Sequence, residues 1–510
     1  MNLESIGLDT NFSILDWCIV IVYLLAVVGV GVYIRRYVVN VADFIVAGRS
    51  LKPCLAIATM IGTELGLVTV MYSSQKGFTG GFAAFHIAFA AAIVTLLVGL
   101  SGFIVVPLRK LKVMTIPEYY EKRFSRGVRI IGGIILAFSG ILNMGLFLKT
   151  GSLFVMGVTH MTSEVELKII MTVMLGFVLL YTTLGGMLSI VVLDYIQFVV
   201  LAFGLLITCF FSIKALGWHN IVDTVSQRYG EAGFNPFDEE IFGTSYVVMM
   251  LFLGLVSCAI WQTAVIRACA ADSIRTVKRL YIWSSIGFMI RSLLPCFFGI
   301  CALVFVSQND SLRPIFLPAE GKADAQVTLM AMPIFLSQIL PMGLIGIISA
   351  AMLAAFMSTH DSYLLCWSSV LAQDVVSPCF KNGLPAKTRL LLNRLFILAI
   401  GLFILIWGLW YPLGQDLWDY MVISGAIYFA GAISLLTFGL YWKRASKTGA
   451  YLSIFAGFGA LLGLKPVQEL LHMDVETDIV GLIATGAAGV LMVLGSLIFP
   501  DRRTFKESRG

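Results

Sequence analysis

Long apolar runs, separated by short polar segments, make up most of the chain. A helix needs about 20 mostly apolar residues to cross roughly 30 Å of hydrocarbon, and most of the runs reach that length. The pattern therefore predicts an all-α, polytopic membrane protein with thirteen spanning helices. Their predicted positions are 14–34, 53–74, 82–106, 130–159, 168–183, 190–213, 245–266, 281–306, 336–357, 390–411, 418–441, 449–464 and 479–499.

The composition excludes a water-soluble enzyme. Of the 510 residues, 59% are hydrophobic and 13% are charged, about half the charged fraction of an ordinary soluble domain. The sequence contains no Walker A motif, no His-Glu-x-x-His and no nucleophile elbow. We therefore expect neither an enzyme nor an ATP-driven pump, and no nucleic-acid partner.

Basic residues set the expected orientation. They cluster after the first, third, seventh, ninth and eleventh spans, and about 25 of the 35 Lys and Arg residues fall on that side. The clusters include Arg35-Arg36, Arg109-Lys110, Arg275 with Lys278, Lys443-Arg444 and Arg502-Arg503. Because basic loops stay in the cytoplasm, we expect a cell-membrane protein with its N-terminus outside and its C-terminus inside.

The second span carries a carboxylate at its midpoint, where Gly62 and Gly66 bracket Glu64. A charged side chain in the bilayer centre costs a few kcal/mol, so it normally faces a cavity or a partner. Flanking glycines suit an unwound helix that presents backbone carbonyls to an ion. The alternative is that the glycines only allow close packing and that Glu64 bonds a neighbouring helix.

The ninth span is interrupted by polar residues between Ala354 and Ser362. Ser358 and Thr359 follow Ala355 by three and four residues, a spacing at which their hydroxyls can reach its carbonyl. One turn thus offers three uncharged oxygens, and hard cations such as Na⁺ prefer oxygen ligands. The alternative is that these hydroxyls only help helices to pack.

Two basic residues lie within predicted spans: Lys149 in the fourth, and Arg291 in the eighth. Lys149 either contacts the transport route or extends to the outer interface. Arg291 either lines the route or pairs with a carboxylate for structural reasons.

Four segments, in order along the chain, resemble the sodium:solute symporter family. Ala47-Gly48-Arg49-Ser50-Leu51 is similar to Gly-Gly-Arg-Ser-Leu, and Thr115–Phe124 to Thr-Ile-Pro-Glu-Tyr-Leu-x-x-Arg-Phe. Tyr181–Met187, followed by Asp194 and Gln197, resembles Tyr-Thr-x-x-Gly-Gly-Leu with its Thr-Asp-x-x-Gln continuation. Ala355–Ser362 resembles Ala-x-Met-Ser-Thr-x-Asp-Ser.

The resemblance implies a LeuT-like core of two inverted five-helix repeats. The predicted organisation is a peripheral helix in residues 1–42, a first repeat in 43–214, an extracellular loop in 215–244, a second repeat in 245–444, and two peripheral helices with a cytoplasmic tail in 445–510. The resemblance also implies a Na⁺ site between the broken first core helix and the eighth core helix. The ligands that it implies are the carbonyls of Gly62, Leu65 and Ala355 and the hydroxyls of Ser358 and Thr359.

Asp194 matches a carboxylate that the family uses in sodium coupling, although a carboxylate near a helix start can also simply stabilise free N–H groups. Glu64 stands where proline-type members carry Asp and where choline-type members carry Trp, which argues against choline. Trp261, Gln262 and Arg267 match a stretch of choline-type members, so we expect the region around them to line the cavity.

The leading hypothesis is Na⁺-coupled uptake of a small organic solute by alternating access, with Lys149 as the group that could bind a solute carboxylate. Symport of H⁺ through Glu64 is one alternative. A non-transporting sensor or a channel-like protein of the same fold is another. The sequence leaves the solute, the number of Na⁺ ions and the oligomeric state open.

Overall fold

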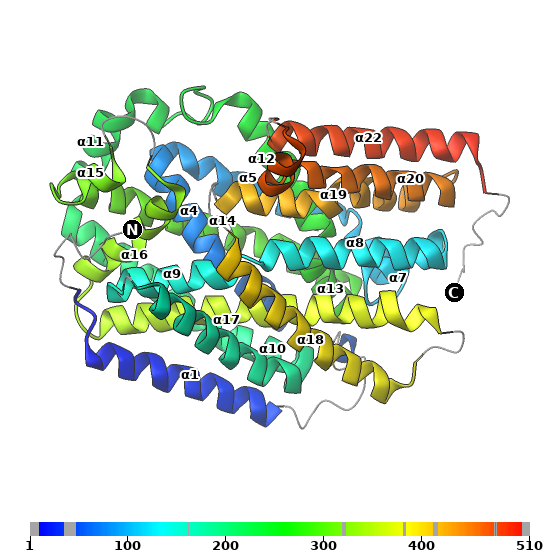
Figure 1. Cartoon of the computed structure of the whole chain (residues 1–510), viewed down its shortest axis with the longest axis horizontal. Helices are drawn as coiled ribbons and strands as arrows, with labels where there is room; N and C mark the ends of the chain where they lie inside the picture. Colours follow the sequence, from blue (N-terminus) through cyan, green and yellow to red (C-terminus); the bar gives the residue numbers. More distant parts are fainter. Residues whose placement is uncertain are drawn as a thin grey trace.

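The computed structural model describes residues 10–34, 47–161, 163–318, 323–380, 384–411, 417–473, 475 and 477–501. Most of these residues form helices that run roughly along one common direction (Figure 1). Two predicted basic pairs, Arg35-Arg36 and Arg502-Arg503, lie outside the described residues, as does the boundary predicted at residue 42.

The helices, in chain order, are α1 (Ile14–Ile34), α3 (Pro53–Glu64), α4 (Leu67–Gly80), α5 (Phe85–Ser101), α6 (Val105–Lys110), α7 (Ile116–Arg123), α8 (Arg126–Met144), α9 (Phe147–Thr159), α10 (Glu164–Leu216), α11 (Trp218–Tyr229), α12 (Gly243–Ile260), α13 (Gln262–Ala270), α14 (Ile274–Ser307), α15 (Arg313–Phe316), α16 (Ala325–Ile339), α17 (Leu344–Val370), α18 (Ala386–Trp410), α19 (Leu417–Tyr441), α20 (Lys447–Phe458), α21 (Lys465–Leu471) and α22 (Thr477–Ile498). The only β-type pairing among the described residues is one isolated bridge, Leu51 with Ala271.

The protein is all-helical and polytopic, as predicted, but the count of thirteen spans is only approximate. Among the described residues, 11 helices are long and apolar enough to cross a membrane, or 12 if one bent pair counts as a single span. The predicted span at 53–74 consists of two short helices, α3 and α4, of 12 and 14 residues. Neither α3 nor α4 alone reaches the roughly 20 residues that a continuous spanning helix needs.

Two helices are interrupted in mid-course. The first break separates α3 from α4 at Leu65 and Gly66, and the second separates α12 from α13 at Trp261. At both breaks a residue adopts an extended backbone conformation: Gly66 has φ −76° and ψ 156°, and Trp261 has φ −71° and ψ 126°. Extended residues leave N–H and C=O groups outside the helical hydrogen-bond pattern.

The predicted ninth span, 336–357, was placed too early. The structure ends α16 at Ile339 and begins α17 at Leu344, and α17 continues to Val370. Segment 354–362 is therefore the interior of a continuous helix, not an interruption. The predicted end at residue 357 is wrong because polar residues follow it. A hydropathy pattern reads such residues as the end of a span, although here they lie on a helix face that is covered by protein.

Burial separates the centre of the bundle from its periphery. In α17, 89% of the most apolar window is buried inside the protein, against 22% in α1 and 28% in α22. Figure 1 places α1 along one edge and α22 along the opposite edge, with α17 between them. The centre thus consists of helices that can present polar groups to one another instead of to lipid.

Candidate functional site

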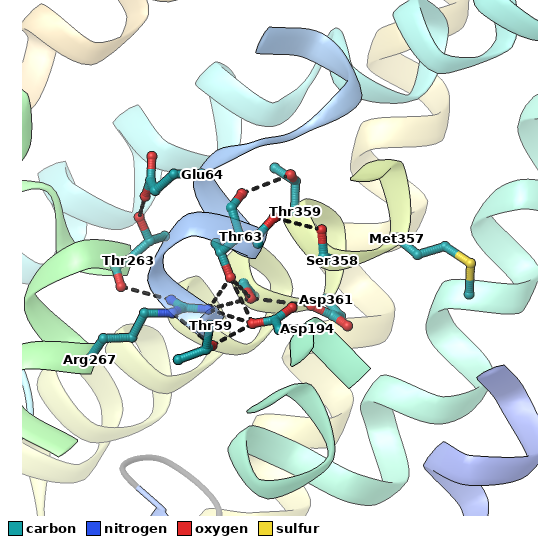
Figure 2. Close-up of polar contacts among 12 residues, drawn as sticks. Thr59, Thr63, Glu64, Asp194, Thr263, Arg267, Met357, Ser358, Thr359 and Asp361 are labelled. Carbon is teal, nitrogen blue, oxygen red and sulfur yellow. Dashed lines mark hydrogen bonds and ion pairs between the residues drawn. The ribbon is translucent and has the colours of Figure 1, made fainter. Parts of the chain in front are cut away.

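The break between α3 and α4 lies directly against α17. The Ser358 hydroxyl donates to the carbonyl of Gly62 at 3.0 Å and to that of Ala355 at 3.1 Å. The Thr359 hydroxyl donates to the carbonyls of Thr63 and Ala355, at 3.0 and 3.1 Å. Both hydroxyls lean back along their own helix, as their spacing predicted, and also reach across to the broken helix (Figure 2).

Gly66 allows this close approach. A Cβ atom at this position would lie 2.3 Å from Oγ1 of Thr359 and 3.1 Å from its Cβ. Any larger residue would therefore push the two segments apart.

Five uncharged oxygens converge here: the carbonyls of Gly62, Thr63 and Ala355 and the hydroxyls of Ser358 and Thr359. This donor set fits a small hard cation, which prefers oxygen ligands. Of the predicted ligands, only the carbonyl of Leu65 makes no hydrogen bond with α17 in the described part of the chain. The described residues also contain no cluster of His, Cys, Asp or Glu that could hold a transition metal.

A charged network lies beside the oxygen cluster. Asp194, on α10, accepts hydrogen bonds from Thr59 at 2.5 Å and from Thr63 at 3.0 Å, and pairs with Arg267 at 3.3 Å. The Arg267 guanidinium, on α13, also bonds Thr59, Thr63 and Ser362. Since Asp194 is fully buried and Arg267 is only 1% exposed, each charge depends on the other and on these hydroxyls.

A second buried carboxylate extends the network. Asp361 accepts hydrogen bonds from the Tyr181 hydroxyl at 2.8 Å and from Ser362 at 3.2 Å. Ser362 also lies 3.0 Å from Thr63. The network therefore connects α3, α10, α13 and α17 across the centre of the bundle (Figure 2).

Glu64 points to the other side of the break. Its Oε1 accepts from the Thr263 hydroxyl at 3.0 Å, and its Oε2 lies 3.3 Å from Nη1 of Arg291. The same Nη1 donates to the backbone carbonyl of Glu64 at 2.7 Å. Arg291 thus holds both the side chain and the backbone of the last residue of α3.

A cavity opens next to this ion pair. Its volume of about 170 Å³ is more than ten times what a single water requires. Its aromatic lining residues are Tyr72, Phe147, Trp261, Phe288, Tyr363, Trp418 and Phe429. Thr63 and Thr359 also line it, so the oxygen cluster and the cavity share the α3–α4 break.

Trp261 and Gln262, both predicted near the cavity, have different environments in the structure. Trp261 lines the cavity, and its indole N–H donates to the Tyr363 hydroxyl at 2.8 Å. Gln262 does not line it: its side-chain amide oxygen, Oε1, accepts from the backbone N–H of Ile116 at 3.0 Å, which ties α13 to the start of α7.

Lys149 lies apart from the cavity and from Glu64. Its ammonium donates to the backbone carbonyl of Tyr411 at 2.9 Å, and the residue is 9% exposed. This partner of Lys149 is thus a backbone carbonyl and not a carboxylate.

Reasoning from the sequence largely misses the residues that organise the network. Arg267 was expected only as part of a cavity-lining stretch, and Asp361 only as part of a motif. Thr59 and Thr63 attracted no attention, although their i, i+4 spacing places both on one face of a helix. That spacing, in the same helix as Glu64, was the signal available.

Comparisons with known proteins agree with this architecture. The model of the sodium:solute symporter family matches residues 44–457. The sodium/sialic acid symporter SiaT of Proteus mirabilis is 24% identical over 473 residues, which cover 90% of this chain and 91% of that protein. The sodium/glucose cotransporter of Vibrio parahaemolyticus is 23% identical over 485 residues, with 90% and 86% covered.

The fold is also that of a solved transporter. A substrate-bound, outward-open structure of a Na⁺-coupled sialic acid symporter superposes with a TM-score of 0.81 at 21% identity, covering 96% of this chain and 100% of that one. This likeness confirms the expected LeuT-like fold. Because the family match covers well over half of the 510 residues, the chain belongs to the sodium:solute symporter family.

Proposed function

We propose that this protein is a secondary active transporter in which Na⁺ entry drives uptake of a small organic solute by alternating access. The observation that carries the proposal is the cluster of oxygens where the α3–α4 break meets α17, directly beside a cavity. The relatives are named as Na⁺ symporters of sialic acid and glucose, and the cluster offers the ligands that a bound Na⁺ needs.

In this proposal Na⁺ is held by the carbonyls of Gly62, Leu65 and Ala355 and by the hydroxyls of Ser358 and Thr359. The carbonyl of Thr63, 3.0 Å from the Thr359 hydroxyl, is a further candidate. A cation here bonds the broken helix and α17 at once, so its binding favours the arrangement in which the two are in contact.

Binding of Na⁺ and of the solute is coupled, because the proposed Na⁺ site and the cavity share the α3–α4 break. Na⁺ fixes the carbonyl side of this segment, while Glu64, Thr63 and Thr359 face the cavity. A solute that prefers the ordered break binds more tightly when Na⁺ is present, and by linkage Na⁺ then binds more tightly when the solute is present.

Proton coupling is the second candidate, because the network holds two buried carboxylates, Asp194 and Asp361, against one guanidinium. Glu64 lies outside this network and is bonded by Thr263 and Arg291 instead. We assign Asp194 a role in ion coupling, because it bonds Thr59 and Thr63 of the broken helix.

The proposed orientation keeps the N-terminus outside and the C-terminus in the cytoplasm of a cell membrane. Figure 1 shows α11 and α15 at one end of the bundle and α7 at the other. Since α11 belongs to the segment 215–244 that is expected to be extracellular, we assign the end that holds α11 and α15 to the outside.

Reconstituted vesicles test the function. We expect solute uptake to follow an inward Na⁺ gradient at constant pH and to vanish when K⁺ replaces Na⁺. Uptake that follows a pH gradient and ignores Na⁺ would establish proton coupling. Solute equilibration without accumulation under either gradient would instead indicate a channel-like protein.

A further inference from the structure

The cavity beside the oxygen cluster contains one acid and one base. Of the described residues that line it, only Glu64 and Arg291 carry charge. Their side chains are each 16% exposed. They are therefore the two charges that a bound solute meets.

Arg291 has an unused hydrogen-bond donor. Both of its hydrogen bonds to described residues come from Nη1, while Nε is buried without a partner. Nη2, by contrast, is not enclosed and makes no hydrogen bond to a described residue. It is therefore the guanidinium donor that an incoming carboxylate can reach, through a charge-assisted hydrogen bond.

Glu64 is held loosely on the side facing Arg291. The contact between Oε2 and Nη1 measures 3.3 Å, longer than the roughly 2.7–2.9 Å of a strong charge-assisted hydrogen bond. An ammonium group placed at Oε2 could make a shorter bond than Arg291 does. The aromatic side chains that line the cavity favour a cation as well. One of these rings, Phe288, already lies 4.2 Å from the Arg291 guanidinium.

We propose that the solute is a small zwitterion, such as an amino acid or a betaine, whose carboxylate binds Nη2 of Arg291 and whose cationic nitrogen binds Glu64. This inference rests on the proposed function, because it names the solute class of that same cavity. It assigns no role in solute binding to Lys149, which is bonded to the Tyr411 carbonyl.

Thermal stabilisation of the purified full-length protein tests the solute class, because a ligand that binds the native state raises its melting temperature. The probes are the proteinogenic L-amino acids and glycine betaine, with D-glucose and N-acetylneuraminic acid as an uncharged and an anionic comparison. Every amino acid that stabilises the protein is then compared with its N-acetyl derivative, which is an anion, and with its amide, which is a cation. All measurements are made in NaCl and repeated in KCl.

We expect at least one zwitterion to stabilise the protein in NaCl, and either modification to weaken its apparent affinity at least about tenfold. Arg291→Gln should abolish the advantage of the amino acid over its amide. Glu64→Gln should abolish its advantage over the N-acetyl derivative. Two exposed positions provide matched controls, Arg275→Gln on the same helix as Arg291 and Glu164→Gln on α10, and should leave both preferences unchanged.

The proposal is overturned if glucose, N-acetylneuraminate or a derivative with a single charge binds as tightly as every zwitterion. It is also overturned if no zwitterion binds while Na⁺ itself stabilises the protein. The comparison among ligands uses the wild-type protein, so a misfolded variant cannot leave the question open. Failure of the proposed function is a different result: stability and uptake would then be indifferent to Na⁺.

Discussion

Buried charges near the bundle centre determine which single residues matter most. Asp194 and Arg267 are almost fully buried, and hydroxyl groups satisfy much of their remaining hydrogen-bonding capacity. Ser358 and Thr359 are also buried, but they carry no charge and donate to backbone carbonyls. The two groups of residues therefore predict different consequences of substitution.

Replacing Ser358 or Thr359 by Ala should raise the Na⁺ concentration needed for half-maximal uptake. Each change removes one oxygen from an ion that has no charged ligand in the cluster, a loss of about 1–3 kcal/mol, or roughly 5- to 150-fold in affinity. Na⁺ titration of uptake measures the effect. Ser368→Ala is the matched control, because the Ser368 hydroxyl also bonds a carbonyl of its own helix, that of Leu365. If Na⁺ activation of the double variant equals that of wild type, the proposed site is wrong.

Breaking the buried ion pair should destabilise the fold, whatever its role in coupling. Asp194→Asn and Arg267→Met should each lower the free energy of unfolding by about 3–5 kcal/mol, because each leaves one buried charge without its partner. The double variant should be more stable than the sum of the two losses predicts. Unfolding of the purified proteins, analysed as a double-mutant cycle, measures this coupling. Asp223→Asn, at an exposed carboxylate of α11, should be nearly neutral, and strictly additive losses would show that the pair is not energetically coupled.

At the scale of elements, function depends on how closely a broken helix and a continuous helix pack. The α3–α4 break supplies carbonyls that no longer belong to a helix, and α17 supplies hydroxyls on a buried face. Neither helix contains the whole cluster. Their separation therefore controls the site, and Gly66 controls their separation.

Gly66→Ala should impair the Na⁺ site without preventing folding. Its new Cβ would lie 2.3 Å from Oγ1 of Thr359, so the break must move away from α17. Overpacking of this kind costs typically about 1–3 kcal/mol, and we expect at least a tenfold increase in the Na⁺ concentration for half-maximal uptake. The matched control is Gly176→Ala on α10, where an added Cβ meets nothing within 4 Å. Unchanged Na⁺ activation in Gly66→Ala would argue that the close approach has no functional importance.

For the whole molecule, the two ends of the bundle differ in what they carry. One end holds α7 (Figure 1), and the basic pair Arg109-Lys110 closes α6 shortly before α7 in the chain. Arg109 donates to the backbone carbonyls of Ala271 and Asp272, which joins α6 to the segment after α13. The opposite end holds α11 and α15.

Cysteine labelling in intact cells tests which end faces the cytoplasm. The natural Cys379 is exposed after α17, on the side predicted to be cytoplasmic. In a variant in which the other cysteines are replaced by Ala, a membrane-impermeant maleimide should label Cys379 only after the cells are permeabilised. Ser226→Cys, at an exposed position of α11, should be labelled without permeabilisation. The reverse result would invert the proposed topology.

The sequence by itself determined the class of fold, most of the spans and one part of the oxygen cluster, the turn formed by Ala355, Ser358 and Thr359. Apolar runs and charge clusters are local features, and the spacing of Ser358 and Thr359 from Ala355 follows from the geometry of one helical turn. Only the tertiary structure decided which charges meet. It paired Glu64 with Arg291 and Asp194 with Arg267, and it placed Lys149 against a backbone carbonyl. These partners lie between 73 and 262 positions apart in the chain, and their contacts depend on how separate helices pack, which no local pattern specifies.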